Sequence, residues 1–158
     1  MQATGVSVAL DEIADAAEHV VRHNFTSLAT GLDLGLTIFV TPGLSPTYSP
    51  GKLGEPTVGI HSYPLPFSLW ADKYQSGQHC EVSSVRQVPE SCWPRTMKAR
   101  SRLHYYLADQ QVRAEQPRAR ALLLDEAGNV NEASTANVVL FVPGEGLVSP
   151  PLDEILPG

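Results

Sequence analysis

The chain has 158 residues, 42% of them hydrophobic, and 17 acidic against 11 basic side chains give a formal net charge of −6. This size and apolar content predict a globular protein, and the acidic balance without any block of basic residues argues against a nucleic-acid-binding surface. No apolar run is long enough to span a bilayer and the first residues lack a signal-peptide layout, so we expect a cytoplasmic protein that acts on small molecules.

The first part of the chain predicts one helix followed by two strands. Apolar residues recur at three- and four-residue spacing over about residues 7–24, which predicts an amphipathic helix with one face packed inward. Runs rich in β-branched residues predict strands over residues 34–40 and 58–63. Two prolines then interrupt regular structure, so we place an interdomain linker at residues 63–66.

The second part of the chain predicts a more strand-rich unit. A strand over residues 79–88 is followed by a loop that leads to Lys98, and a helix begins near Leu103 and ends before Pro117. The remainder has the alternation and turn residues of a β-meander. Its predicted strands cover residues 121–125, 130–134, 137–142 and 147–149.

Several common site types have no signature here. Cys80 and Cys92 fit neither a disulfide framework nor a metal-ligand pattern, and the histidines lack the spacing of zinc ligands. The chain also has no glycine-rich phosphate loop and no Gly-x-Ser-x-Gly nucleophile turn. We therefore expect no metal site and no serine-hydrolase chemistry.

Lys98 is a candidate nucleophile because three arginines lie close to it in the sequence, at positions 95, 100 and 102. Nearby positive charge favours the uncharged amine, which attacks aldehydes readily. On these residues alone, a lysine in a basic stretch is more often an ordinary solvated surface residue. Arg102 is a candidate for binding a substrate carboxylate or for forming a salt bridge.

A second candidate is Glu132, which lies 34 positions after Lys98 and begins the run Glu-Ala-Ser-Thr-Ala-Asn. Small residues would let a flat ring approach the backbone, and Ser134 and Thr135 would offer hydroxyl groups. The same composition is also ordinary for a hairpin, so the run alone leaves both interpretations open.

Lys98, the run from Glu132 and the closing segment from Ser149 to Gly158 together resemble the class IV aminotransferases. These fold-type IV enzymes depend on pyridoxal phosphate and include branched-chain and D-amino-acid aminotransferases and aminodeoxychorismate lyase. The resemblance implies an α+β fold of the D-amino-acid aminotransferase type. Residues 1–66 would be the C-terminal part of a small domain with its linker, and residues 67–158 a larger cofactor-binding domain without its C-terminal part.

The resemblance also implies roles for individual residues. Lys98 would be the catalytic residue that carries the cofactor through its aldehyde and moves the substrate proton. Glu132 would face the pyridine nitrogen, Ser134 and Thr135 would contact the cofactor, and Leu156 would pack on the ring. The implied partners are an amino acid, a 2-oxo acid and a second copy of the chain in a homodimer.

Three functions follow as alternatives. The first is transamination, and the second is a lyase reaction of the aminodeoxychorismate lyase type. Branched-chain members follow the lysine with Gly-Gly-Asn-Tyr, whereas residues 99–103 differ here, and the spacing of Lys98 and Arg102 is closer to lyase-like members. The third alternative is a catalytically incompetent fragment that acts as an interaction module, because the resemblance covers only the middle of a family member and the phosphate-binding segments are expected to be missing.

Overall fold

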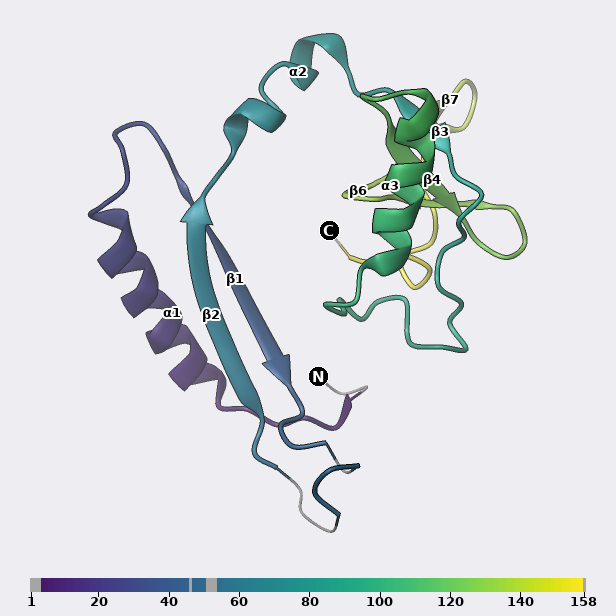
Figure 1. Ribbon diagram of the computed structural model, residues 1–158. Coiled ribbons are helices and arrows are strands. Elements are labelled where there is room, and N and C mark those ends of the chain that lie inside the picture. The colour runs from purple at the N-terminus through teal and green to yellow at the C-terminus, as the bar shows by residue number, and fades with distance from the viewer. Residues whose placement is uncertain (1–3, 46, 51–53, 158) are drawn as a thin grey trace. The chain divides into compact units, whose positions relative to one another are not determined.

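The computed structural model describes residues 4–45, 47–50 and 54–157, in which the chain forms two compact units, Met1–Ala71 and Asp72–Gly158 (Figure 1). Both units combine helices with strands, which confirms the predicted α+β class. The boundary between the units follows Ala71, a few residues after the predicted linker at 63–66. The assignment of these units to parts of a small and a large domain stays a prediction.

The first unit is a helix on a two-stranded antiparallel sheet. Helix α1 (Leu10–Phe25) packs against strands β1 (Leu34–Thr41) and β2 (Thr57–Pro64), as Figure 1 shows. The Asn24 side chain donates a hydrogen bond of 2.8 Å to Ser62 Oγ and so joins the end of the helix to β2. These three elements confirm the helix and the two strands that the sequence predicts.

Two glycines of the hairpin lie under aromatic rings of the opposite strand. Gly35 pairs with Tyr63 and Gly59 pairs with Phe39. A Cβ atom at Gly35 would lie 2.6 Å from the Tyr63 ring, and one at Gly59 would lie 2.2 Å from the Phe39 ring. Each ring therefore packs directly on the glycine backbone, where a side chain would clash with it. This cross-strand packing helps to set the register.

The pairing of β2 continues further than its prolines suggest. Pro64 is opposite Leu34, and the Leu65 amide donates a bond of 2.7 Å to the Asp33 carbonyl. A proline is tolerated at the end of an edge strand because no partner there needs its missing N–H. Two short helices that the sequence did not predict then follow, η2 (Phe67–Leu69) and α2 (Lys73–Ser76).

The second unit contains one long helix, a mixed sheet and a separate hairpin. Helix α3 (Leu103–Glu115) is confirmed as predicted and packs on the sheet. The sheet has the order β3-β4-β5-β6, in which β3 is parallel to β4 and the other pairs are antiparallel. Its strands are β3 (Cys80–Val82), β4 (Arg120–Leu124), β5 (Val130–Ala133) and β6 (Ala136–Asn137).

The strand predicted over residues 137–142 is wrong as a single element. Its first residue belongs to β6, and its last three form β7 (Leu140–Val142), which pairs with β8 (Gly146–Val148) in a two-stranded sheet of its own. A continuous apolar run covers residues 138–142, so the pattern could not reveal the change of sheet. The β-meander is therefore correct for β4, β5 and β6 but does not extend to the hairpin.

The core of the second unit lies between α3 and β4. Tyr105, Ala108 and Val112 of the helix pack against Ala121 and Leu123 of the strand. Three apolar residues of the helix, Leu103, Tyr106 and Leu107, are instead 63%, 60% and 47% exposed. The buried face also includes Asp109, a charged residue that needs partners where it is buried.

Within the part of the chain that the structure describes, no helix has both the length and the apolar content needed to cross a membrane.

Candidate active site

Glu132 is a buried carboxylate on β5 whose two oxygens have different surroundings. The residue is only 4% exposed, and its Oε1 accepts hydrogen bonds from Gln87 Nε2 and from the Tyr105 hydroxyl. Its Oε2 has no hydrogen-bond partner among the described residues. In the described part of the chain Oε2 is not among the fully buried side-chain atoms that lack a partner, so this oxygen keeps contact with solvent. The site therefore holds one oxygen of the carboxylate and leaves the other available.

Gln87 reaches Glu132 because the chain beyond β3 stays alongside β4. The Ser83 and Gln87 amides donate bonds of 3.0 Å to the Leu122 and Leu124 carbonyls, which extends the parallel pairing past the end of β3. The Gln87 amide nitrogen lies 3.0 Å from Tyr105 Oη and 3.0 Å from Asn131 Oδ1. Backbone pairing thus positions this side chain, although the strand predicted over residues 79–88 is wrong in extent, because β3 covers only Cys80–Val82.

Tyr105 projects from the buried face of α3 to the same carboxylate. Burial raises the pKa of Tyr105 to about 12, with the Glu132 bond acting in the same direction and the Gln87 bond against it. The phenol therefore remains a protonated donor at neutral pH. The Arg102 guanidinium lies over the ring, with its Cζ 4.2 Å from the ring centroid, in a cation–π arrangement.

Ser134 is joined to a buried network centred on Asp109. Asp109 Oδ1 accepts bonds of 2.8 Å from Ser134 Oγ and 2.9 Å from the Ala121 amide, while Oδ2 pairs with Arg113 and Arg120. Burial alone would raise the pKa of Asp109, but the hydrogen bonds and the two arginines outweigh it and lower that pKa. The Ser134 hydroxyl thus fastens the residue after β5 to α3, and its predicted cofactor contact stays a prediction.

Lys98 presents a contrasting environment. It is exposed and lies between Pro94 and Leu103 in a segment without regular secondary structure, where the Met97 amide bonds the Pro94 carbonyl at 2.9 Å. In the described part of the chain Lys98 has no hydrogen-bond or ion-pair partner. Its amine is therefore not engaged by another side chain.

The residues on either side of Lys98 nevertheless line a cavity together with the two side chains that bond Glu132. A small cavity of about 20 Å³ is lined by residues from four parts of the second unit. Met97 and Ala99 contribute to it together with Gln87, Tyr105 and Leu156. The structure thus places the two neighbours of Lys98 and the predicted ring-packing residue Leu156 around the same cavity as the two side chains that hold Glu132. The predicted contact of Leu156 with a cofactor ring stays a prediction.

The closing segment is fastened to the sheet by side chains. Asn131 Nδ2 donates 2.6 Å to the Glu154 carbonyl, and Asn137 Nδ2 donates 2.8 Å to the Leu156 carbonyl. The Arg95 guanidinium pairs with the Glu154 carboxylate and so joins the loop before Lys98 to the same segment. These bonds explain how Leu156 is held at the cavity. Gly158, expected to lead into a phosphate-binding turn, lies outside the described residues.

Arg102 and Thr135, two further predicted site residues, do not line the small cavity. Arg102 Nη2 donates 2.9 Å to the Ser134 carbonyl, so the guanidinium links the start of α3 to the residue after β5. This contact is neither the salt bridge nor the substrate contact suggested by the sequence, and the latter stays a prediction. Thr135 is exposed in the turn between β5 and β6, and its role toward a cofactor is likewise untested.

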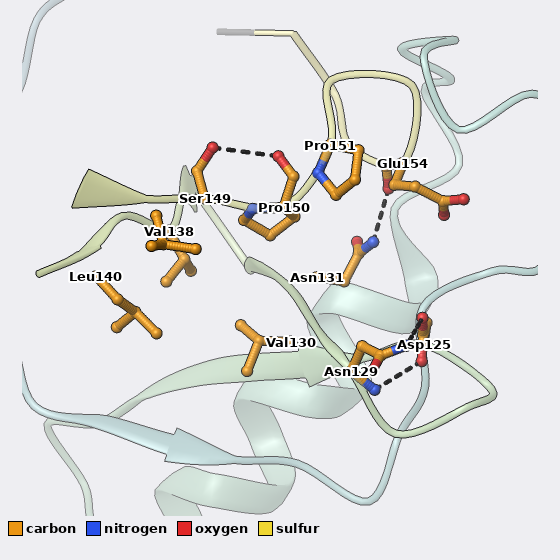
Figure 2. Close-up of a pocket in the computed structure, with 11 residues that line it drawn as sticks. Asp125, Asn129, Val130, Asn131, Val138, Leu140, Ser149, Pro150, Pro151 and Glu154 are labelled. Carbon is orange, nitrogen blue, oxygen red and sulfur yellow. Dashed lines mark hydrogen bonds between the residues drawn. The ribbon is translucent and has the colours of Figure 1, made fainter. Parts of the chain in front are cut away.

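A larger cavity of about 390 Å³ lies beside β5, as Figure 2 shows. It shares Asn131 and Glu154 with the framework of the site, but neither Lys98 nor Glu132 lines it. The Asn131 side chain points to the Glu154 carbonyl in this view. Its lining is mostly apolar and comprises Asp125, Asn129, Val130, Asn131, Val138, Leu140, Val148, Ser149, Pro150, Pro151 and Glu154.

Sequence reasoning missed Gln87, Tyr105 and Asp109. A helical projection offers the one available signal, because Tyr105, Asp109 and Val112 recur at three- and four-residue spacing and share a face with an acidic residue. A charged residue on a buried helical face requires polar partners, so the pattern could have predicted a buried polar network at this face. Gln87 carries no comparable signal, since its position depends on pairing with a strand more than 30 residues away.

The sequence matches the family described as amino-transferase class IV over residues 1–158. Among solved structures, branched-chain amino acid aminotransferases from Escherichia coli and Thermoproteus uzoniensis are 26% and 27% identical to the chain, with TM-scores of 0.75 and 0.70. Each comparison covers 97% of this chain and 49% of the other protein. A comparison with curated proteins gives no match.

The branched-chain amino acid aminotransferase of Thermobaculum terrenum, solved in its PLP form, has 24% identity and a TM-score of 0.72. The comparison covers 96% of this chain and 47% of that protein, and at this identity the likeness shows the fold alone. The chain thus spans about half the length of these solved relatives. The α+β fold is that of the fold-type IV aminotransferases, and the family match over the whole sequence shows that the chain belongs to the class IV aminotransferases.

Proposed function

We propose that this site serves a transamination in which an amino group passes between an amino acid and a 2-oxo acid. The observation that carries the proposal is the buried Glu132 carboxylate, which has one oxygen held by two donors and the other without a partner among the described residues. The neighbours of Lys98 line a cavity with those same two donors. Because the chain spans about half the length of its solved relatives, the reaction is a proposal for the site.

The cofactor implied by the family is pyridoxal phosphate, and the groups present fit it. Its pyridine nitrogen, when protonated, is an N–H donor that suits a buried carboxylate oxygen. Its aldehyde suits an amine that no other side chain engages. When bound, this cofactor supplies an electron sink for charge that develops at the substrate Cα.

The residues of the chain divide the remaining work. Glu132 would accept a hydrogen bond from the ring nitrogen through Oε2 and keep the proton there. Lys98 Nζ would hold the cofactor covalently and then move the proton of the substrate Cα. Leu156, fixed by the Asn137 bond to its carbonyl, would cover an apolar face. Met97 and Ala99, which line the cavity, would exclude water from it.

The substrate is proposed only as a class. The solved relatives with 26% and 27% identity are named as branched-chain amino acid aminotransferases, yet residues 99–103 lack the Gly-Gly-Asn-Tyr stretch that the resemblance associates with that subfamily. The spacing of Lys98 and Arg102, which suggested a lyase, has another explanation in the structure. Arg102 bonds the Ser134 carbonyl and covers Tyr105.

We further propose a homodimeric assembly for this protein. Exposed apolar side chains are numerous on and near the β7–β8 hairpin, where Phe141, Leu147 and Leu152 are 73%, 78% and 72% exposed. Apolar surface of this kind favours association. Sedimentation equilibrium over a range of protein concentrations should show a dimer, and a monomer throughout that range would contradict this proposal.

The experiment that tests the reaction measures transfer of an amino group. The protein is incubated with pyridoxal phosphate, 2-oxoglutarate and a panel of L- and D-amino acids, and the glutamate formed is quantified by chromatography. We expect glutamate from at least one donor, and none above background with Lys98→Ala. Turnover by the Lys98→Ala variant equal to that of the unaltered protein would contradict the proposal.

A further inference from the structure

Glu132 is held by two side chains that come from different elements. Gln87 follows β3 and Tyr105 belongs to α3, and both donate to the same oxygen, Oε1. All three residues are buried, with exposed fractions of 6%, 6% and 4%. We call Gln87 and Tyr105 the Oε1 clamp.

The donors of the clamp are fully committed. The Gln87 amide has two N–H groups, and three acceptors surround its nitrogen: Asn131 Oδ1, Tyr105 Oη and Glu132 Oε1. Gln87 Oε1 in turn accepts a bond of 2.9 Å from the Val88 amide, which fixes which end of the side-chain amide faces the carboxylate. The amide therefore cannot rotate without losing bonds on both sides.

The convergence of both donors on one oxygen needs an explanation. One donor on each oxygen would occupy the whole carboxylate, whereas two donors on a single oxygen leave the other oxygen available to a further donor. Here Oε1 has two donors and Oε2 has none among the described residues. The torsion that orients a glutamate carboxylate is broad when nothing holds it. Two donors from separate elements define its plane.

We propose that Gln87 and Tyr105 are positioning residues that fix the Glu132 carboxylate so that Oε2 is presented to an N–H donor of a protonated heteroaromatic ring. This inference rests on the proposed function, since the ring is that of the cofactor. It adds two residues to the site, neither of which needs to touch the reacting atoms. They act through Glu132.

Two substitutions remove the clamp while altering shape little. Tyr105→Phe deletes one hydroxyl group, and Gln87→Met keeps a side chain of similar length without donors. Tyr106→Phe and Gln110→Met are matched controls, because both residues are exposed on α3 outside the clamp. Thermal unfolding of each variant establishes that it is folded before binding is measured, and the two clamp substitutions lie on different elements.

The test compares two ligands that differ at the ring nitrogen. Dissociation constants are measured by fluorescence titration for pyridoxal phosphate and for its 1-deaza analogue, in which carbon replaces that nitrogen. Each clamp substitution should raise the dissociation constant of pyridoxal phosphate about tenfold, as expected for the loss of a hydrogen bond to a charged group. The dissociation constant of the analogue should change less than about twofold. The controls should leave both constants unchanged.

Each other outcome overturns a stated claim. Equal weakening of both ligands would show that the clamp only maintains structure, and would overturn the positioning role. Clamp variants that match their controls would overturn it too, while normal binding of pyridoxal phosphate by the unaltered protein would leave the proposed function standing. If the unaltered protein binds neither ligand, the proposed function fails, and the clamp fails with it.

Discussion

The two ends of the candidate site differ in how the fold prepares them. At one end Glu132 is buried on a strand and bonded by side chains from two other segments. At the other end Lys98 is exposed on a segment without regular structure and has no partner in the described part of the chain. The carboxylate is built into the core, whereas the amine depends on turns and on one ion pair between Arg95 and Glu154.

This contrast follows from the chemistry that each residue is proposed to perform. A carboxylate that holds a proton on a ring nitrogen has to remain in one place, and burial with directed hydrogen bonds provides that. An amine that forms a covalent bond and then carries a proton needs freedom to move between positions. The fold supplies rigidity to Glu132 and leaves the Lys98 side chain unrestrained.

The largest effect should come from removing the amine. After incubation with pyridoxal phosphate and reduction with borohydride, the cofactor should be attached to Lys98, and Lys98→Ala should abolish nearly all of that label. Peptide mapping by mass spectrometry measures the label, with Lys73→Ala as the control because Lys73 is paired with Asp72. Labelling of Lys52 and Lys73 as readily as Lys98 would contradict the assignment.

The next largest effect should come from the Asp109 network. Asp109→Asn should lower the free energy of unfolding by about 3 kcal/mol, because it leaves Arg113 and Arg120 without their partly buried counter-charge. Urea unfolding measures the change, with the exposed Asp153→Asn as the control. A loss no larger than that of the control would show that the network does not hold β5 to α3.

The same carboxyl gives a pH dependence with a definite sign. Because the pKa of Asp109 is lowered in the folded protein, its contribution is present above the unfolded-state pKa and is lost as pH falls through the folded-state pKa. The unaltered protein should therefore lose stability in acid more steeply than Asp109→Asn. Parallel curves of unfolding free energy against pH would contradict this.

A smaller loss of stability is expected when Glu132 itself is substituted. Without any cofactor, Glu132→Ala should lower the free energy of unfolding by about 2 kcal/mol, because Gln87 and Tyr105 lose their common acceptor while buried. The exposed Glu126→Ala is the matched control. If both substitutions give the same free energy in urea unfolding, the carboxylate is not part of the folded framework.

The smallest effect on stability is expected at Lys98, the other end of the site. Lys98→Ala should change the free energy of unfolding by less than about 0.5 kcal/mol, as is usual for an exposed side chain without partners. The measurement is again urea unfolding without cofactor. A loss comparable to that of Glu132→Ala would mean that the two ends are equally built into the fold.

The elements of the fold could largely be predicted from the sequence because they rest on local patterns. The 3.6-residue period identified α1 and α3, β-branched residues identified β1 and β2, and turn residues on either side identified β4 and β5. The switch from β6 to β7 could not be predicted, since the choice of partner strand is made by tertiary packing. The same holds for the parallel pairing of β3 with β4.

For the site, sequence reasoning could name residues but not their surroundings. Lys98 and Glu132 were identified through the resemblance, and composition alone left both open. The partners of Glu132 come from residues 45 and 27 positions away in sequence, Gln87 and Tyr105, and no local pattern relates such distant residues. The difference between a held and a free carboxylate oxygen depends on those partners and therefore emerges only in three dimensions.

The central claim is that Lys98 and Glu132 hold opposite ends of one cofactor molecule. The most direct test is nitrogen-15 NMR of pyridoxal phosphate labelled at the ring nitrogen and attached to Lys98, in the unaltered protein and in Glu132→Gln. The account predicts a protonated ring nitrogen in the unaltered protein, and a shift toward the unprotonated value in Glu132→Gln while attachment to Lys98 persists. Identical nitrogen-15 shifts in the two proteins would contradict it.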